Sequence, residues 1–227
     1  MTTASFSSDS RSQVAERPDG GGEYLFTNNW FESNAKRVWE KLFAQYKPGK
    51  VLEIGSYEGA STCYLIEKLA QNLSVEIHCI DSWGGGIEHV NWEIDMAEVE
   101  ARFSHNTALA ISRVSRPVSL VVHKGLSHSC LATLISQNQG NSFDLVYVDG
   151  SHQAPDVLAD AVMAFLLLKV GGILIFDDYV WSENLSYGRD PLRCPKMAID
   201  AFVNCYFRKV EVIPAPLRQL YMRKVAE

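Results

Sequence analysis

Four side chains that could hold a metal ion and move a proton follow two apolar runs of the sequence. Asp149 and His152 come after FDLVYV, in the order Asp-Gly-Ser-His. Asp177 and Asp178 come directly after ILIF. If the two runs are neighbouring strands, about 4.8 Å apart, the acids at their ends can converge. Consecutive strand residues point to opposite faces, so Asp178 can join Asp177 only if the chain is already leaving the strand there.

These acids predict a metal site. Three carboxylates with no cysteine nearby form a hard oxygen site, which suits Mg²⁺ or Mn²⁺ better than zinc. Such closely placed acids would repel one another, and a divalent cation removes that cost. The alternative is a turn carboxylate at Asp149 followed by a solvated or helix-capping pair at Asp177 and Asp178. His152 is either a loop histidine or a general base, because its ordinary pKa suits neutral pH.

A second constellation lies near the start of the chain, in KVLEIGSYEGA. Glu53 lies near the end of a short apolar run, Gly55 follows, and Gly59 precedes a helical pattern. A strand, a glycine turn and a helix form the front half of a nucleotide-binding unit. We expect Gly55 to permit a sharp turn and a close ligand approach, and Gly59 to let the helix pack against the strand. The alternative is an ordinary glycine turn of an α/β protein.

The elements after this turn extend the predicted nucleoside site. Asp81 ends the next apolar run, VEIHCI, and an acid at that place can accept both ribose hydroxyls. Trp83 and the glycines 84–86 follow as a loop beside the ligand, with Trp83 as a stacking surface. The segment 87–111 is mostly helical, and its long first half is a candidate substrate lid.

The spacing E-x-G-x-x-x-G resembles motif I of the class I S-adenosylmethionine (SAM)-dependent methyltransferases. It is neither the G-x-G-x-x-G of dinucleotide binders nor a P-loop. The resemblance implies that motif I holds the amino-acid end of SAM and that the turn at Gly125 and Ser127 lies beside the adenine. The predicted cofactor-binding residues are Glu53, Gly55, Ser56, Tyr57, Gly59, Asp81, Trp83, Gly125, Ser127 and Asp149.

The acids and His152 resemble one branch of that family, the metal-dependent O-methyltransferases of macrolide sugars, of the mycinamicin 2''-O-methyltransferase type. The resemblance implies that Asp149, Asp177 and Asp178 bind Mg²⁺ or Mn²⁺. It also implies that His152 is the catalytic base. If the proton goes elsewhere, we expect Asp149 or a metal-bound hydroxide to take it. The first acid of the final pair can be Glu in that branch and is Asp177 here, so a shorter arm could shift the metal or weaken the site.

The order of elements predicts one α/β domain. Apolar runs alternate with helical patterns and short turns, which indicates a mostly parallel sheet with helices on both faces. The resemblance implies a Rossmann-like seven-stranded sheet in the order 3-2-1-4-5-7-6, with strand seven antiparallel. We expect residues 1–22 to be a disordered tail and 23–227 a single methyltransferase domain. We expect a helix over 30–46, with Asn29 and Glu32 as its capping pair. We favour the interpretation that this helix only packs on the domain; the alternative is that it also covers the cofactor cleft.

Composition limits the partners and the compartment. The 227 residues carry a net charge of −6, which argues against nonspecific binding to nucleic acid or anionic membrane. No apolar run is long enough to span a bilayer, and the N-terminus lacks the apolar core of a signal peptide. We therefore predict a cytoplasmic protein, with its oligomeric state open, a homo-oligomer included. The five cysteines form no C-x-x-C pair, which fits a reducing compartment; they are Cys63, Cys79, Cys130, Cys194 and Cys205.

The function predicted is methyl transfer from SAM to a hydroxyl of a small molecule, a sugar or natural product, assisted by a metal. The first rival is a metal-independent methyltransferase that acts on nitrogen or a macromolecule, although no NPPY or DPPY follows FDLVYV. The second is a non-catalytic SAM-binding protein, which would not need the acid pair. A nicotinamide dehydrogenase is a more distant alternative, because the chain lacks G-x-G-x-x-G.

Overall fold

The computed structural model describes residues 22–87 and 93–227. The predicted tail, 1–22, lies outside the described residues except for Gly22, and so do His89 and Trp92 of the predicted lid. Within the described part, seven strands form one sheet in the order β3-β2-β1-β4-β5-β7-β6. Strands β1 to β5 pair in parallel, and β7 runs antiparallel to both neighbours, which confirms the predicted topology. The strands are β1 (Lys50–Ile54), β2 (Val75–Asp81), β3 (Val118–Lys124), β4 (Phe143–Val148), β5 (Leu168–Phe176), β6 (Val210–Ile213) and β7 (Leu220–Lys224).

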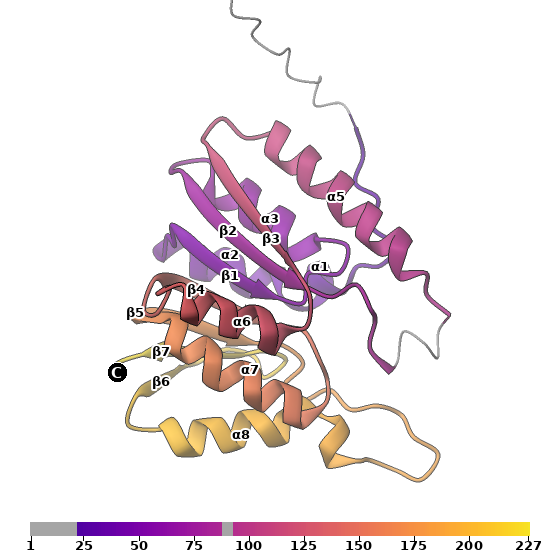
Figure 1. Cartoon of the computed structure of the whole chain (residues 1–227), viewed down its shortest axis with the longest axis vertical. Coiled ribbons are helices and arrows are strands. Elements are labelled where there is room, and N and C mark those ends of the chain that lie inside the picture. Colours follow the sequence, from indigo (N-terminus) through magenta and orange to yellow (C-terminus); the bar gives the residue numbers. More distant parts are fainter. Residues whose placement is uncertain (1–21, 88–92) are drawn as a thin grey trace, which may run out of the picture.

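Helices cover both faces of the sheet and close two cores. Figure 1 shows α6, α7 and α8 on one face, with α2 and α3 on the other. None of the helices within the described residues is long and apolar enough to cross a membrane. The helices are α1 (Trp30–Asn34), α2 (Lys36–Gln45), α3 (Ala60–Leu69), α5 (Met96–Ser112), α6 (Ser127–Ser136), α7 (Ala154–Leu167), the 3₁₀ turn η1 (Pro191–Arg193) and α8 (Pro195–Tyr206).

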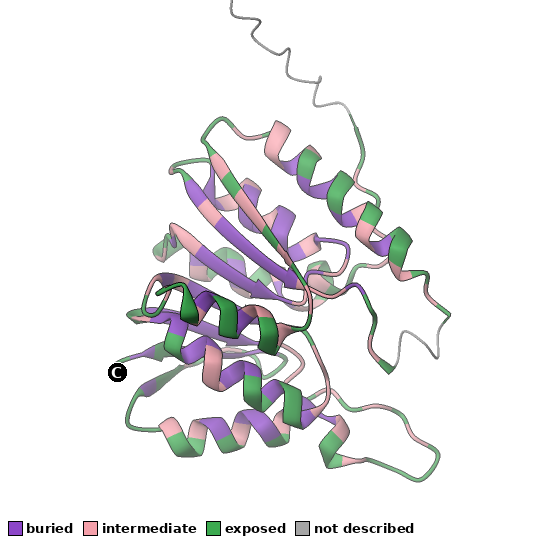
Figure 2. Ribbon diagram, viewed as in Figure 1, coloured by how far each residue is buried: buried purple, intermediate pink, exposed green. Residues whose placement is uncertain are grey.

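The central strands are buried on both faces and end at a common edge. Residues 51–54 of β1 and 145–148 of β4 are all buried, as expected of parallel strands between two helical layers (Figure 2). The register pairs Val148 of β4 with Phe176 of β5. The next residues, Asp149 and Asp177, therefore leave the sheet side by side.

Two local predictions were wrong. The helix expected over 30–46 breaks at Ala35, which ends α1 and begins α2, and the Asn29 side chain makes no capping hydrogen bond. The pattern DVLADAVMAFLLLKV predicts a helix that Gly171 and Gly172 end, but α7 ends at Leu167 and both glycines lie inside β5. A Cβ on Gly172 would lie 2.7 Å from the Leu168 side chain, so the glycine allows an irregular start of that strand.

Candidate active site

A cavity of about 900 Å³ lies at the carboxyl ends of the parallel strands. This is where open α/β sheets bind ligands. Both predicted constellations reach it, as do the glycine loop after Trp83 and the turn that begins α6. The predicted site residues that line it are Gly55, Ser56, Tyr57, Asp81, Gly125, Ser127, Asp149, His152, Asp177 and Asp178.

The short helix α1 also lines the cavity, through Trp30, Phe31 and Asn34. The sequence allowed two interpretations of this segment: packing on the domain alone, which we favoured, or covering the cofactor cleft as well. The second interpretation holds for α1. By contrast, α2 packs on the domain, with Trp39 and Phe43 fully buried. The break at Ala35 thus divides the two roles between two helices.

Both motif glycines adopt a left-handed backbone, which confirms the sharp turn predicted at Gly55. Gly55 has φ 84°, and a Cβ there would lie 2.0 Å from the Asp149 carbonyl oxygen. Its missing side chain therefore lets the turn pack against the end of β4, and Gly55 also lines the cavity. Gly59 has φ 81°, and a Cβ there would lie 3.0 Å from the Phe103 ring of α5, so this glycine brings two helices together rather than a helix and a strand.

Glu53 is a buried structural acid. Its side chain has no exposed surface, and it is not among the described residues that line the cavity. Hydroxyls at the start of α3 and in the glycine loop donate to it: Ser61 at 2.5 Å, Ser56 at 2.7 Å, and Thr62. Burial raises the pKa of Glu53, and these donors lower it part of the way back. The predicted contact with the amino-acid end of SAM is thus corrected: Glu53 holds the motif I loop.

Asp81 fixes the same loop from the second strand. One carboxylate oxygen accepts the backbone N–H groups of Ser56 and Tyr57, both at 2.9 Å. The other oxygen accepts the N–H of Trp83 at 2.8 Å. Because a carboxylate offers about four acceptor positions, Asp81 can still meet a ligand, and its side chain lines the cavity.

Trp83 does not face the cavity. Its ring is only 6% exposed, lies 5.0 Å from the Phe103 ring, and is not among the described cavity-lining residues. Its indole N–H donates to the Tyr57 carbonyl at 3.1 Å. The expectation of a cofactor-stacking surface is therefore wrong, and the tryptophan braces the motif I loop from behind. Of the glycines after it, Gly85 and Gly86 line the cavity.

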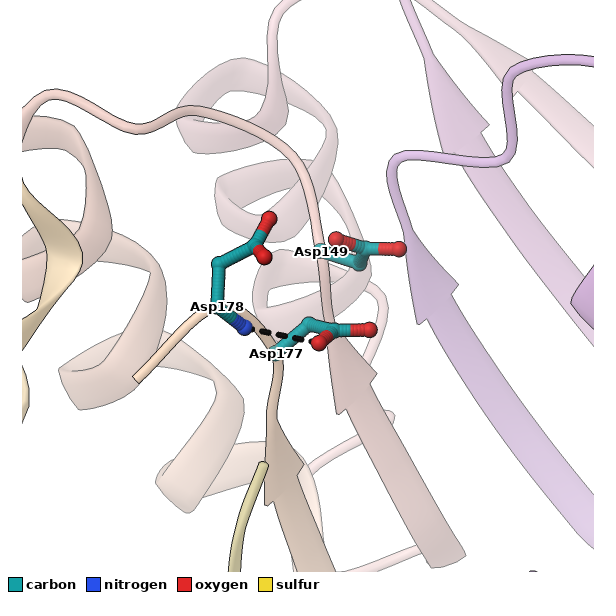
Figure 3. A group of neighbouring side chains, drawn as sticks. All are labelled: Asp149, Asp177 and Asp178. Carbon is teal, nitrogen blue, oxygen red and sulfur yellow. Dashed lines mark hydrogen bonds between the residues drawn. The ribbon is translucent and has the colours of Figure 1, made fainter. Parts of the chain in front are cut away.

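The three predicted metal ligands converge at the ends of β4 and β5 (Figure 3). One oxygen from each of Asp149, Asp177 and Asp178 lies within 4.8 Å of the others. Asp177 still pairs with the sheet, because its N–H donates to the Val148 carbonyl at 2.9 Å. Asp178 has φ 55°, so the chain leaves the strand at that residue and turns its carboxylate to the same side.

The electrostatics of the cluster fit a divalent cation. Burial raises the pKa of Asp149 well above its usual value, and the charges of Asp177 and Asp178 raise it further. Burial and the Asp178 charge also raise the pKa of Asp177. The donor set consists only of carboxylate oxygens, which Mg²⁺ and Mn²⁺ prefer. A cation there would relieve the repulsion that these shifts reflect.

His152 is held over the acids by two neighbours. Its Nε2 lies 2.8 Å from an oxygen of Asp178. Its ring stacks on Trp181, with centroids 4.0 Å apart and planes at 24°. The predicted base therefore has a fixed orientation beside the predicted metal ligands, at the wall of the cavity.

A buried network behind the acids was missed from the sequence. The Tyr147 hydroxyl donates to Asp149 at 2.8 Å and also contacts Asp177. Gln219 donates to Asp177 at 2.8 Å and accepts the indole N–H of Trp39 at 3.0 Å. Strand periodicity was the available signal for Tyr147, because it lies two residues before Asp149 and so on the same face. Gln219 precedes Leu220, the partner of Phe176, so the pairing register places it beside Asp177.

The sequence matches the family model described as "Methyltransferase domain" over residues 52–179. The match covers more than half of the chain and contains motif I, Asp81, Asp149, His152 and both final acids. The chain therefore belongs to the methyltransferase-domain family. A search of curated proteins finds no match.

Solved structures of O-methyltransferases share the fold at low identity. A Bacillus cereus O-methyltransferase in complex with SAH is 16% identical, with a TM-score of 0.55 over 86% of this chain and 80% of that one. TomG from Streptomyces achromogenes, involved in tomaymycin synthesis and solved with SAM, is 16% identical, with a TM-score of 0.57 over the same shares. MycE of the mycinamycin pathway, solved with Mg, SAH and mycinamycin VI, is 17% identical, with a TM-score of 0.50 over 86% of this chain and 50% of that one.

Proposed function

We propose that this protein transfers a methyl group from SAM to a hydroxyl of a small molecule of the sugar or natural-product type, and that Mg²⁺ or Mn²⁺ assists the transfer. The observation that carries the proposal is the meeting of motif I and the acid cluster in one cavity. A cavity of about 900 Å³ is large enough for SAM and a small acceptor. The net charge of −6 favours a small acceptor over nucleic acid or a membrane surface.

Three features favour a metal-assisted transfer over the rivals. The acid cluster has only oxygen ligands and raised pKa values, as a cation site would before loading. A non-catalytic SAM-binding protein would have no use for three converging carboxylates. Two structural neighbours, TomG and MycE, belong by their names to natural-product pathways, and MycE was solved with Mg.

His152 is the residue we assign to the proton. When bound, SAM supplies the electrophilic methyl, and a divalent cation lowers the pKa of the acceptor hydroxyl and fixes its direction. His152 removes the hydroxyl proton, with its ring held by Asp178 and Trp181. Tyr147 and Gln219 keep the acids in place by donating hydrogen bonds from behind.

Binding measurements test the cofactor and the metal separately. By calorimetry we expect SAH to bind and NADH not to bind, with Asp81→Ala weakening SAH by about tenfold or more. We expect Mn²⁺ to raise the melting temperature of the protein, and the double variant Asp177→Asn, Asp178→Asn to lose that shift. Glu211→Gln is the control, because Glu211 is an exposed acid on β6. Binding of NADH in place of SAH would overturn the proposal, and an unchanged Mn²⁺ shift in the double variant would remove the metal from it.

His152→Ala completes the test once an acceptor has been found by screening hydroxylated sugars and phenols. Its SAH affinity should stay near that of the wild type, while kcat falls about a hundred- to ten-thousand-fold. Normal turnover in this variant would assign the proton to another group, with Asp149 the next candidate. A metal-independent enzyme would methylate its acceptor equally well after chelation.

A further inference from the structure

Arg218 is a cation at an otherwise acidic cavity. It lies in the segment before β7, is exposed, and lines the cavity. Within residues 22–87 and 93–227 no other arginine and no lysine lines the cavity, whereas several carboxylates do. A guanidinium is always charged and presents several N–H donors in a planar fork that matches a carboxylate or a phosphate.

The guanidinium of Arg218 is positioned but not neutralised. It donates a hydrogen bond to the side-chain oxygen of Asn34, which lies on α1 and also lines the cavity. Asn34 is neutral, and in the described part of the chain no carboxylate forms an ion pair with Arg218. Arg193, in the loop after β5, differs because it pairs with Glu183 at 2.6 Å. Arg218 therefore keeps its charge available to a ligand.

The strand order indicates which ligand would meet Arg218. The neighbouring strands follow as β2, β1, β4, β5 and β7, and β7 is antiparallel, so its start lies at the carboxyl ends of the others. Under the proposed function the nucleoside of SAM lies at Asp81 after β2, its amino-acid end at the motif I loop after β1, and its methyl group at the acids after β4 and β5. Arg218 lies beyond those acids. The acceptor must attack the methyl from the side opposite the sulfur, so this region belongs to the acceptor.

The backbone contacts of Arg218 agree with this placement. Its carbonyl accepts the N–H of Tyr179, the residue after Asp178, at 3.0 Å. The residue after it, Gln219, donates to Asp177 at 2.8 Å. Arg218 is thus tied to both of the final acids, and its side chain extends from there to α1.

We propose that Arg218 binds an anionic group of the methyl acceptor, so that the protein selects hydroxylated carboxylates or phosphates over neutral compounds of the same shape. The assignment rests on the proposed function and narrows its acceptor class. The competing anion is the carboxylate of SAM, because α1 also contacts the motif I loop, where the rings of Trp30 and Tyr57 lie 5.5 Å apart. The two anions are distinguished by whether acceptor or SAH affinity depends on Arg218.

Calorimetry with matched pairs of probes tests the proposal. One pair is 3,4-dihydroxybenzoate and its neutral amide, and the other is glucuronate and glucuronamide, so the members of a pair differ mainly in charge. With the protein saturated with SAH and Mn²⁺, the wild type should bind the anion of at least one pair about tenfold or more tightly than the amide. Arg218→Gln should reduce that ratio about tenfold. The metal is present in both proteins, so its own attraction for anions largely cancels in the comparison.

Three further variants separate charge from shape. Arg218→Lys keeps the charge but loses the planar fork, so it should retain part of the preference. Asn34→Asp keeps Arg218 but gives it a counter-ion, so the preference should fall as in Arg218→Gln. Arg208→Gln is the control and should keep the wild-type ratio, because Arg208 is exposed and is not among the described residues that line the cavity.

SAH affinity separates this assignment from the proposed function. Arg218→Gln should bind SAH within about threefold of the wild type. A tenfold loss of SAH affinity with an unchanged probe ratio would give the guanidinium to the carboxylate of SAM and overturn the assignment. Equal binding or no binding of anionic and neutral probes by the wild type would also overturn it, while leaving SAM as the cofactor. Failure of the wild type to bind SAH would overturn the proposed function itself. A melting curve for each variant shows whether a lost affinity comes from a lost fold.

Discussion

The two sides of the cavity each contain a buried acid, Glu53 at the motif I loop and Asp160 on α7. Glu53 lies in the pattern that the sequence marks as a cofactor site, but hydroxyls from Ser56, Ser61 and Thr62 satisfy it and it does not line the cavity. Asp160 lies in an unremarkable helix and lines the cavity; among the described residues no donor meets its oxygens in hydrogen-bond geometry, although the nearby Ser127 hydroxyl lowers its pKa. The comparison separates an acid that builds a loop from an acid that is available to a ligand.

The same contrast appears in energetic terms. Burial raises the pKa of both acids, but donors reduce the shift for Glu53. For Asp160 burial and the charge of Asp156 outweigh the opposing effects of Ser127 and His128, and its pKa rises to about 6. A structural acid should therefore cost stability when removed, and an unpartnered one should return stability when neutralised.

The largest effect is expected for Glu53→Ala. Three buried hydroxyls would lose their acceptor at once, so the free energy of unfolding should fall by about 3–5 kcal/mol. Urea unfolding followed by circular dichroism measures this change. Glu53→Gln, which keeps one carbonyl oxygen as an acceptor, should lose clearly less. A Glu53→Ala protein of wild-type stability with a hundredfold lower SAH affinity would show instead that Glu53 binds the cofactor.

Asp160→Asn should have a smaller effect of the opposite sign. The pKa of Asp160 is about 6 in the folded chain against a usual value of 3.8, so the folded state loses stability relative to the unfolded chain as the pH rises from about 4 to about 6. The variant lacks that penalty. Its stability relative to wild type should rise from near zero below about pH 4 to about 3 kcal/mol above about pH 6.

Unfolding measured at several pH values, without ligand, tests this expectation. The neighbours Asp156 and His128 are present in both proteins, so their effects largely cancel in the difference. Glu211→Gln should show no such trend, because Glu211 is exposed. A loss of stability in Asp160→Asn at pH 8 would mean that the carboxylate has a partner in the folded chain, and the comparison with Glu53 would fail.

The fold and the acid cluster could be predicted because they depend on local signals. Alternating apolar runs and helical patterns predicted a mostly parallel sheet, and the resemblance to the methyltransferase family supplied its strand order. The ends of neighbouring parallel strands bring Asp149 and Asp177 together. The sequence predicted that Asp178 joins Asp177 only if the chain turns out of the strand there, and the φ of 55° at Asp178 shows that turn. The sheet sets the position of residues next to strand ends. Their place in the sequence therefore largely predicts where they lie in the site.

The roles of Glu53 and Asp160 could not be predicted because they depend on tertiary partners. The run KVLEIG does not indicate that hydroxyls of α3 will surround Glu53. Periodicity does place Asp160 on the apolar face of α7, three residues after the buried Val157 and one before the buried Ala161. It cannot show that this face opens on a cavity at that residue.

Trp83→Phe gives the smallest expected effect and tests the structural side of the comparison. Phenylalanine keeps the contact with Phe103, 5.0 Å away in the wild type, but it cannot donate to the Tyr57 carbonyl. Loss of that one hydrogen bond should lower the free energy of unfolding by about 1 kcal/mol.

The SAH affinity of Trp83→Phe should change by less than about threefold, since the indole does not line the cavity and Asp81 still holds the loop through two backbone N–H groups. Calorimetry and unfolding on the same preparation measure both quantities. A tenfold loss of SAH affinity at unchanged stability would identify Trp83 as a cofactor contact. The expected result is lower stability with unchanged SAH affinity. Trp83 would then resemble Glu53, since both would shape the motif I loop without contacting the cofactor.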